Sequence, residues 1–189
     1  MKRILIVATG GTIAGVGEVG KSASYQAGEI NIDEIIESIP ALKHLAHLSA
    51  IQLFNVDSNE IDEAKLIKLA NELNVLLARD DVDGIVVTHG TDTLDETAYF
   101  LNLTLKTYKP VILTGAMRPA TATSADGPMN LYQAVALACN DQALGHGVMA
   151  VFSDTIYSGR DIQKVNNFKT DAFDKKDFGC LGYMRDDQA

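Results

Sequence analysis

The segment Thr9-Gly10-Gly11-Thr12 follows directly on the apolar run of residues 4–8 (Ile-Leu-Ile-Val-Ala). An apolar run that ends in two glycines and a hydroxyl residue predicts a buried strand followed by a sharp turn. A second apolar run, residues 85–87, ends in Thr88-His89-Gly90-Thr91. In open parallel sheets, ligands bind outside the carboxyl ends of the strands, near the point where the strand order reverses. We therefore expect the hydroxyls of Thr12 and Thr91 to meet at one crevice, where one of them acts as a nucleophile.

Apolar runs and helical patterns alternate along the 189 residues, which is typical of βαβ units and of an α/β domain. The expected fold is a mainly parallel sheet with helices on both faces. Strands are expected at residues 3–9, 49–56, 84–89, 111–114 and 148–152, and helices at about residues 31–39, 61–77, 94–105 and 129–138. Residues 124–128 (Ser-Ala-Asp-Gly-Pro) supply capping groups and an early proline for the last helix.

Two segments lack a regular pattern. Residues 15–20 contain three glycines shortly before Tyr25, and we expect an irregular, mobile lid over the end of the first strand. Residues 179–189 end in the polar run Arg185-Asp186-Asp187-Gln188, and we expect a linker without a final element.

The formal net charge is −9. Nucleic-acid binding depends on neutralising phosphates with Lys and Arg, so the charge argues against a nucleic-acid partner and favours a small-molecule substrate. The apolar stretch of residues 4–8 is too short for a secretory signal or a membrane span. We therefore expect no membrane association and a cytoplasmic location, or a periplasmic one if an N-terminal signal has been removed.

Metal-binding and disulfide patterns are weak in this chain. His44 and His47 lie three residues apart on an expected helix, but no nearby carboxylate or cysteine pattern completes a metal site. Cys139 and Cys180 have no metal-ligand spacing, and we expect buried thiols rather than a disulfide.

A threonine hydroxyl is a weak nucleophile at neutral pH and needs a base and donors for the developing oxyanion. We expect the backbone N–H groups of Gly11, Thr12 and Thr91 to face the crevice as such donors. Either glycine turn alone is explained about equally well as a tight connection between a strand and a helix. The two turns together are much more specific.

Four further side chains admit two interpretations each. Asp92 can orient a hydroxyl or an ammonium group, or it can cap the helix expected from residue 94. Lys164 can act as a base only as the neutral amine, and a neighbouring Asp92 carboxylate favours the ammonium form, so its spacing alone favours a solvated lysine. Tyr25 is more often a packing residue, and His89 more often a hydrogen-bonded structural histidine.

Several segments in a fixed order extend the pattern of the two turns. They are residues 8–15, 24–28, 88–101, 109–119 (Lys-Pro-Val-Ile-Leu-Thr-Gly-Ala-Met-Arg-Pro), 124–131 and 159–164. Together they closely resemble the bacterial-type L-asparaginase family, including its glutaminase-asparaginases, over nearly the whole chain. The resemblance implies the N-terminal catalytic domain of the asparaginase fold.

The resemblance also implies an activity: an amidohydrolase that converts L-asparagine to L-aspartate and ammonia through a threonine acyl-enzyme, with no cofactor or metal. Thr12 would be the nucleophile and Tyr25 would assist it from the lid. Thr91, Asp92 and Lys164 would activate the attacking group or water. The expected substrate-binding residues are Gly11, Ser58, Asn59, Asp92 and Ala116, with Ser58 and its neighbour at the α-carboxylate and α-amino end and the Ala116 backbone at the scissile amide.

Two departures from the family pattern leave alternatives open. Asp57-Ser58-Asn59 stands where many members carry Gly-Ser-Gln, so a dual glutaminase-asparaginase is the first alternative. The family's smaller C-terminal domain, which in the expected homotetramer completes the site of a neighbouring subunit, is absent from residues 1–189. A non-catalytic amino-acid-binding domain is therefore the second alternative. A nucleotide-binding Rossmann module is disfavoured because residues 10–15 lack the Gly-x-Gly-x-x-Gly spacing.

Overall fold

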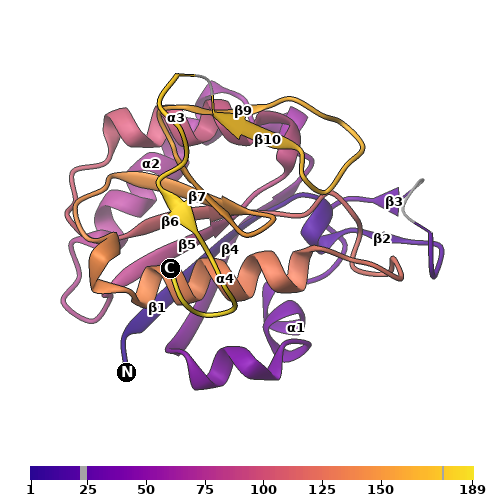
Figure 1. Cartoon of the computed structure of the whole chain (residues 1–189), viewed down its shortest axis with the longest axis horizontal. Coiled ribbons are helices and arrows are strands. Elements are labelled where there is room, and N and C mark those ends of the chain that lie inside the picture. Colours follow the sequence, from indigo (N-terminus) through magenta and orange to yellow (C-terminus); the bar gives the residue numbers. More distant parts are fainter. Residues whose placement is uncertain (22–24, 176) are drawn as a thin grey trace.

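Seven strands form one sheet in the computed structural model, which describes residues 1–21, 25–175 and 177–189. Their order is β11-β8-β7-β6-β5-β1-β4. The five parallel strands are β1 (Arg3–Gly10), β4 (His47–Val56), β5 (Gly84–Thr88), β6 (Val111–Thr114) and β7 (Val148–Phe152) (Figure 1). These are the strands expected from the sequence, and the α/β fold class is confirmed.

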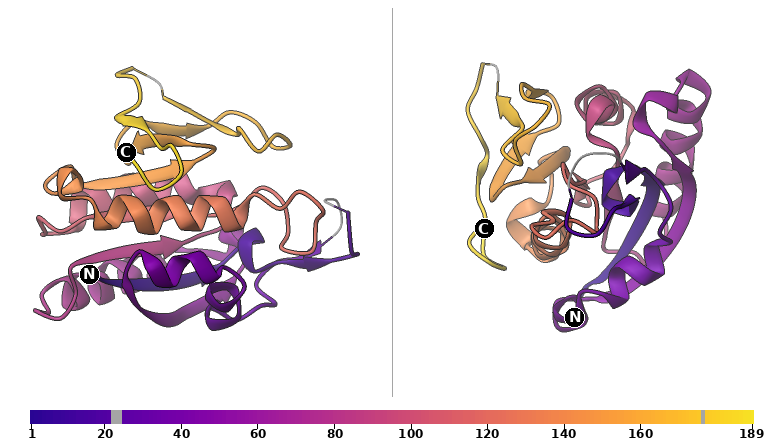
Figure 2. Two further views of the ribbon diagram at one scale, coloured as in Figure 1. Left: turned by 60° about the horizontal axis from the view of Figure 1, so that its bottom comes forward. Right: turned by 90° about the vertical axis from the view of Figure 1, so that its right-hand side faces the viewer.

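Two helical layers enclose the sheet because successive strand residues point to opposite faces. On β1, Ile4 and Ile6 enter one core while Leu5 and Val7 enter the other. The helices α1 (Ile32–Glu37) and α4 (Gly127–Cys139) cover the first face, and α2 (Glu63–Leu77) and α3 (Leu94–Thr104) cover the second (Figure 2). Short 3-10 turns precede several helices, and three of them matter below: η1 (Thr12–Ala14), η3 (Ser58–Glu60) and η4 (Thr91–Thr93).

Four short strands after residue 152 were not expected. β8 (Thr155–Ser158) and β11 (Gly182–Tyr183) extend the main sheet in antiparallel direction, and β9 (Ile162–Lys164) pairs with β10 (Phe173–Lys175) in a separate two-stranded sheet. The expectation that residues 179–189 contain no regular element is wrong, because β11 pairs with β8 and Met184 is buried beside it.

The segment expected to be an irregular lid contains a small hairpin. β2 (Val16–Gly17) pairs antiparallel with β3 (Tyr25–Gln26), and the Gly17 N–H donates to Thr121 Oγ1 at 3.0 Å. The segment of residues 24–28 that contributes to the family resemblance begins at Ser24, which lies outside the described residues. The hairpin carries Tyr25 toward the end of β1.

The structure also tests three smaller expectations. His44 lies in the 3-10 turn η2 (Pro40–His44) and His47 in β4, so the two do not share a helix face. Both cysteines are free thiols, but they are half-buried rather than buried. None of the helices in the described ranges is long and apolar enough to cross a membrane.

Candidate active site

Glycines allow three strand-end turns to pack directly against one another. In the sheet, β1 lies between β4 and β5, so the strand order reverses there. Gly11 has φ +82, and a Cβ at this position would clash with the backbone of Gly90. A Cβ at Gly90 would lie 2.7 Å from the Cβ of Ser58. Because these positions have no side chain, the three turns η1, η3 and η4 can pack directly against one another.

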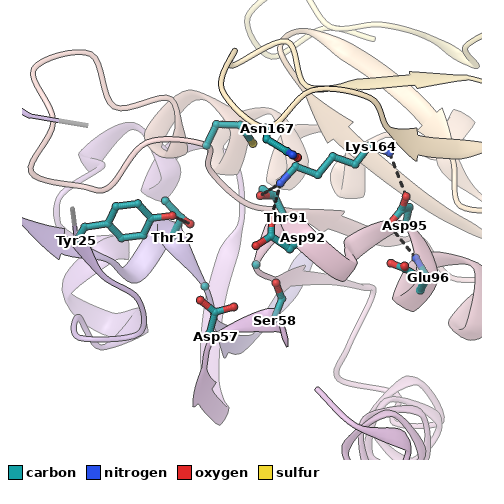
Figure 3. Close-up of a pocket in the computed structure, with 13 residues that line it drawn as sticks. Thr12, Tyr25, Asp57, Ser58, Thr91, Asp92, Asp95, Glu96, Lys164 and Asn167 are labelled. Atoms are coloured by element: carbon teal, nitrogen blue, oxygen red, sulfur yellow. Dashed lines mark hydrogen bonds and ion pairs between the residues drawn. The ribbon is translucent and has the colours of Figure 1, made fainter. Parts of the chain in front are cut away.

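A cavity of about 670 Å³ opens at this place (Figure 3). The sequence-predicted residues that line it are Gly11, Thr12, Tyr25, Ser58, Thr91, Asp92 and Lys164. Asn59 and Ala116 are not among the lining residues, although each adjoins one that is. The structure therefore brings the two threonine hydroxyls to one cavity, as expected from the strand order.

Thr12 and Tyr25 form one side of the cavity. The Thr12 side chain is held in η1 with only 6% of the residue exposed, and its Oγ1 lies 2.7 Å from the Tyr25 hydroxyl. Tyr25 is 38% exposed in the β3 hairpin. Tyr25 is thus a hydrogen-bonding partner of Thr12 through its hydroxyl, in addition to any packing of its ring.

Thr91, Asp92 and Lys164 form the opposite side. Lys164 Nζ donates to Thr91 Oγ1 at 2.9 Å and to Asp92 Oδ1 at 2.5 Å, and its side chain is only 9% exposed. The spacing had favoured a solvated lysine, which is wrong because residues 162–164 fold back onto the start of α3. The hydrogen bond from Lys164, supported by one from Asn59, lowers the pKa of Asp92. Asp92 does not cap α3, whose N-cap residue is Thr93.

Asn59 connects two carboxylates at the floor of the cavity. Its Nδ2 donates to Asp57 Oδ1 at 3.0 Å and to Asp92 Oδ2 at 3.2 Å. Both Asp92 oxygens are thus engaged, one by Lys164 and one by Asn59. Ser58 is buried, and Thr93 Oγ1 donates to its carbonyl at 2.9 Å. Asn59 therefore orients Asp92 and reaches the cavity through Asp57 and Asp92.

Asp126, at the start of α4, holds the loop that follows β6. Asp126 accepts the backbone N–H groups of Met117 and Arg118, both at 2.9 Å. Asp126 makes no side-chain cap for α4, contrary to the expected use of residues 124–128 as capping groups. Ala116 is fully buried, and Met117 beside it lines the cavity.

Two of the three expected oxyanion donors are available. The Gly11 N–H donates to the Val56 carbonyl at 3.0 Å, so the expectation that it faces the crevice is wrong. The Thr12 and Thr91 amides donate to no acceptor in residues 1–21, 25–175 and 177–189. Two hydroxyls, a lysine amine, a carboxylate and two free amide donors at one cavity are the groups that acyl transfer requires.

His89 lies beneath this site as a structural residue. It is fully buried, its Nδ1 is 2.7 Å from the Gly90 carbonyl, and its Nε2 is 3.0 Å from Thr97 Oγ1. Burial lowers the pKa of His89, and the hydrogen bond to Gly90 opposes this effect. The structural interpretation of His89 agrees with these contacts.

The lowered pKa of His89 predicts a loss of stability in acid. The unfolded chain takes up a proton at about pH 6.5 whereas the folded chain does not, so stability is fully present above this pH and falls as the pH is lowered, by at most about 1.4 kcal/mol per pH unit. We expect His89→Gln to remove this slope between pH 7 and pH 5 in urea unfolding experiments. An unchanged slope in the variant would contradict a neutral, buried His89.

Six further residues line the cavity. Asp57 and Gly90 lie in segments that the sequence analysis singled out, whereas Asp95, Glu96, Met117 and Asn167 were missed. Asp95 and Glu96 follow Asp92 by three and four residues, which places them on one helical face, so the spacing of these acids was a usable signal. No comparable pattern marks Met117 or Asn167. Within the described residues no group of three or more His, Cys, Asp or Glu side chains is placed to hold a metal ion.

The chain matches the protein-family model described as asparaginase, N-terminal, over residues 3–189. L-asparaginase 2 of Bacillus subtilis (strain 168) is 51% identical over 188 residues, which are 99% of this chain and 50% of that protein. Glutaminase-asparaginase of Acinetobacter glutaminasificans is 47% identical over 182 residues, 96% of this chain and 55% of that protein. The crystal structure of a probable cytoplasmic L-asparaginase from Campylobacter jejuni matches with a TM-score of 0.96 at 48% identity, covering 99% of this chain and 57% of that one.

The chain spans about half the length of the curated relatives that it matches. The names of its relatives also point to two compartments. Beside the Campylobacter jejuni protein, a Haemophilus influenzae protein that is 42% identical, over 97% of this chain and 52% of its own length, is named a probable periplasmic L-asparaginase.

Proposed function

Because this chain belongs to the asparaginase family, we propose that it hydrolyses the side-chain amide of L-asparagine to L-aspartate and ammonia. The observation that carries the proposal is the placement of the Thr12–Tyr25 pair and the Thr91–Lys164–Asp92 group around one cavity. Each half supplies a hydroxyl with a proton-carrying neighbour, which is what a two-step acyl transfer needs.

In the first step we propose that Thr12 Oγ1 attacks the amide carbon. The new C–O bond gives a tetrahedral intermediate whose oxyanion is stabilised by the free amide donors. The Thr12 proton passes by way of the Tyr25 hydroxyl, 2.7 Å away, to the departing nitrogen. The C–N bond then breaks, ammonia leaves, and the substrate acyl group remains as an ester of Thr12.

In the second step we propose that water attacks this ester. Lys164, as the neutral amine, can take up the proton that the water gives up by way of the Thr91 hydroxyl, 2.9 Å away. The proton returns to Thr12 Oγ1 as the ester bond breaks, and aspartate is released. Asp92 holds the Lys164 amine beside Thr91 throughout, and its carboxylate also attracts the α-ammonium group of the substrate.

For substrate binding we propose that Ser58 and Asp92 hold the α-carboxylate and the α-amino group, with the Ala116 backbone near the scissile amide. Asn59 supports Asp92 through its hydrogen bond of 3.2 Å. The extra carboxylate of Asp57 lies at the same end of the cavity and favours a cationic group there.

We expect Asn59→Leu to raise the KM for asparagine about tenfold and to change kcat less. A hydrogen bond to a charged group contributes roughly 1.5–3 kcal/mol, and about 1.4 kcal/mol is tenfold in affinity. The contact is made to Asp92, away from the reacting carbon, so the loss is expected in binding. Steady-state kinetics with Asn59→Asp as a size-matched comparison measures it; a KM within twofold of the wild-type value for Asn59→Leu would remove Asn59 from substrate recognition.

The proposed function is tested by ammonia release from asparagine, glutamine and D-asparagine, with the oligomeric state read from the same sample. Turnover of asparagine alone supports an asparaginase, and comparable turnover of glutamine supports the dual activity named for the Acinetobacter relative. Calorimetric binding of asparagine without ammonia release supports the non-catalytic alternative and would overturn the proposal.

We further propose that the intact protein is a homotetramer in which the smaller C-terminal domain of a neighbouring subunit completes each site. The support is family membership and the half-length span of the match. A cytoplasmic location is proposed from the Campylobacter jejuni relative, and fractionation of cells with a periplasmic marker tests it.

A further inference from the structure

Lys164 does not belong to the main sheet that positions the other site residues. It ends β9, which pairs only with β10 in the separate two-stranded sheet (Figure 1). Thr12, Ser58 and Thr91, in contrast, follow strands of the seven-stranded sheet directly. The placement of the Lys164 amine at Thr91 therefore needs a separate structural cause.

A contact between β9 and α3 supplies this cause. The backbone N–H of Lys164 donates to Asp95 Oδ2 at 3.0 Å, across 69 residues of sequence (Figure 3). The next N–H, that of Val165, donates to Ala172 at 2.8 Å on the β10 side. Since successive N–H groups of a strand point in opposite directions, the Lys164 N–H is directed at α3 and needs an acceptor there.

The same short segment holds both ends of the lysine residue. Thr91 and Asp92, in η4, accept from Nζ, while Asp95, in the first turn of α3, accepts from the backbone nitrogen. A side-chain hydrogen bond to Asp95, together with burial, raises the pKa of Glu96. In this neighbouring pair Glu96 thus retains a proton more readily than an ordinary glutamate.

We propose that Asp95 is a positioning residue for Lys164: its carboxylate fixes the backbone of β9 so that the lysine amine lies beside Thr91. This inference rests on the proposed hydrolysis. Asp95 does not take part in the chemistry itself. The reaction requires only that its Oδ2 accept the backbone N–H of Lys164. A displacement of about 1 Å at a reacting group can cost on the order of a hundredfold in rate, so loss of this contact is expected to be visible in kcat.

The test compares Asp95→Ala with Asp95→Asn in the intact enzyme. Both variants lose the negative charge, but asparagine keeps an oxygen that can accept the Lys164 N–H. We expect Asp95→Ala to lower kcat at least about tenfold, with KM within about threefold and an altered pH–rate profile, and Asp95→Asn to stay within about threefold of wild type. Asp174→Ala, which removes an exposed carboxylate from β10 opposite Gln163, serves as the control and should leave the kinetics unchanged.

Amide hydrogen exchange at Lys164 reports on the contact without reference to activity. It should accelerate at least about tenfold in Asp95→Ala and remain close to wild type in Asp95→Asn, because only alanine removes the acceptor. A wild-type kcat and pH–rate profile in Asp95→Ala, or an equal loss in Asp95→Asn, would overturn the positioning role. If the wild-type enzyme releases no ammonia, the proposed function fails, and the exchange rates still decide whether Asp95 holds Lys164.

Discussion

Replacement of Thr12 by alanine is expected to abolish ammonia release from asparagine, by on the order of a thousandfold or more, while the fold remains intact. The covalent route cannot start without the Thr12 oxygen, because the acyl-enzyme is an ester of that atom. The fold should tolerate the change: the turn depends on Gly10 and Gly11, and the lost hydrogen bond to Tyr25 contributes about 1 kcal/mol.

The measurement is steady-state ammonia release together with thermal unfolding. Thr12→Ser is the matched control, since it keeps an oxygen at the same position and should retain part of the activity. Wild-type turnover in Thr12→Ala would remove Thr12 from the nucleophile role and leave Thr91, the other threonine at the cavity, as the candidate.

Removal of the Lys164 amine by Lys164→Met is expected to lower kcat by on the order of a hundredfold or more, the usual scale for a positioned proton carrier. Methionine retains an unbranched chain of similar length in a side-chain position that is only 9% exposed. Lys175→Met is the control, because Lys175 lies on the paired strand β10 with an exposed side chain that forms an ion pair with the surface residue Asp174.

The Lys164→Met variant also changes Asp92 in a way that needs no turnover. The hydrogen bond from Lys164 is the main cause that lowers the pKa of Asp92, so the variant should raise this pKa toward the ordinary value for aspartate, near about 4. Carboxyl chemical shifts followed by NMR through an acid titration measure the change. An unaltered Asp92 titration with an unaltered rate would remove Lys164 from the proton-carrying role.

The sequence by itself determined the framework of the site. Apolar runs such as residues 4–8 and 85–87 predict buried strands, and the turns that follow them predict Thr12 and Thr91 at the carboxyl end of one sheet. These signals are local, since each depends on the order of residues within a few positions. They were therefore readable without the fold, and the five parallel strands confirm them.

The tertiary structure alone decided the turn between β7 and β8 and the position of Lys164. The turn at Ser153 and Asp154 contains no glycine although both residues have positive φ, and Asn130 and Gln133 of α4 stabilise it through hydrogen bonds of 3.2 and 2.6 Å. Likewise, Lys164 is buried against Asp92, and a side chain 69 residues earlier, that of Asp95, accepts its backbone N–H. Hydrogen bonds between residues so distant in sequence leave no local pattern, and only the packing of β9 and α4 against the rest of the fold brings their partners together.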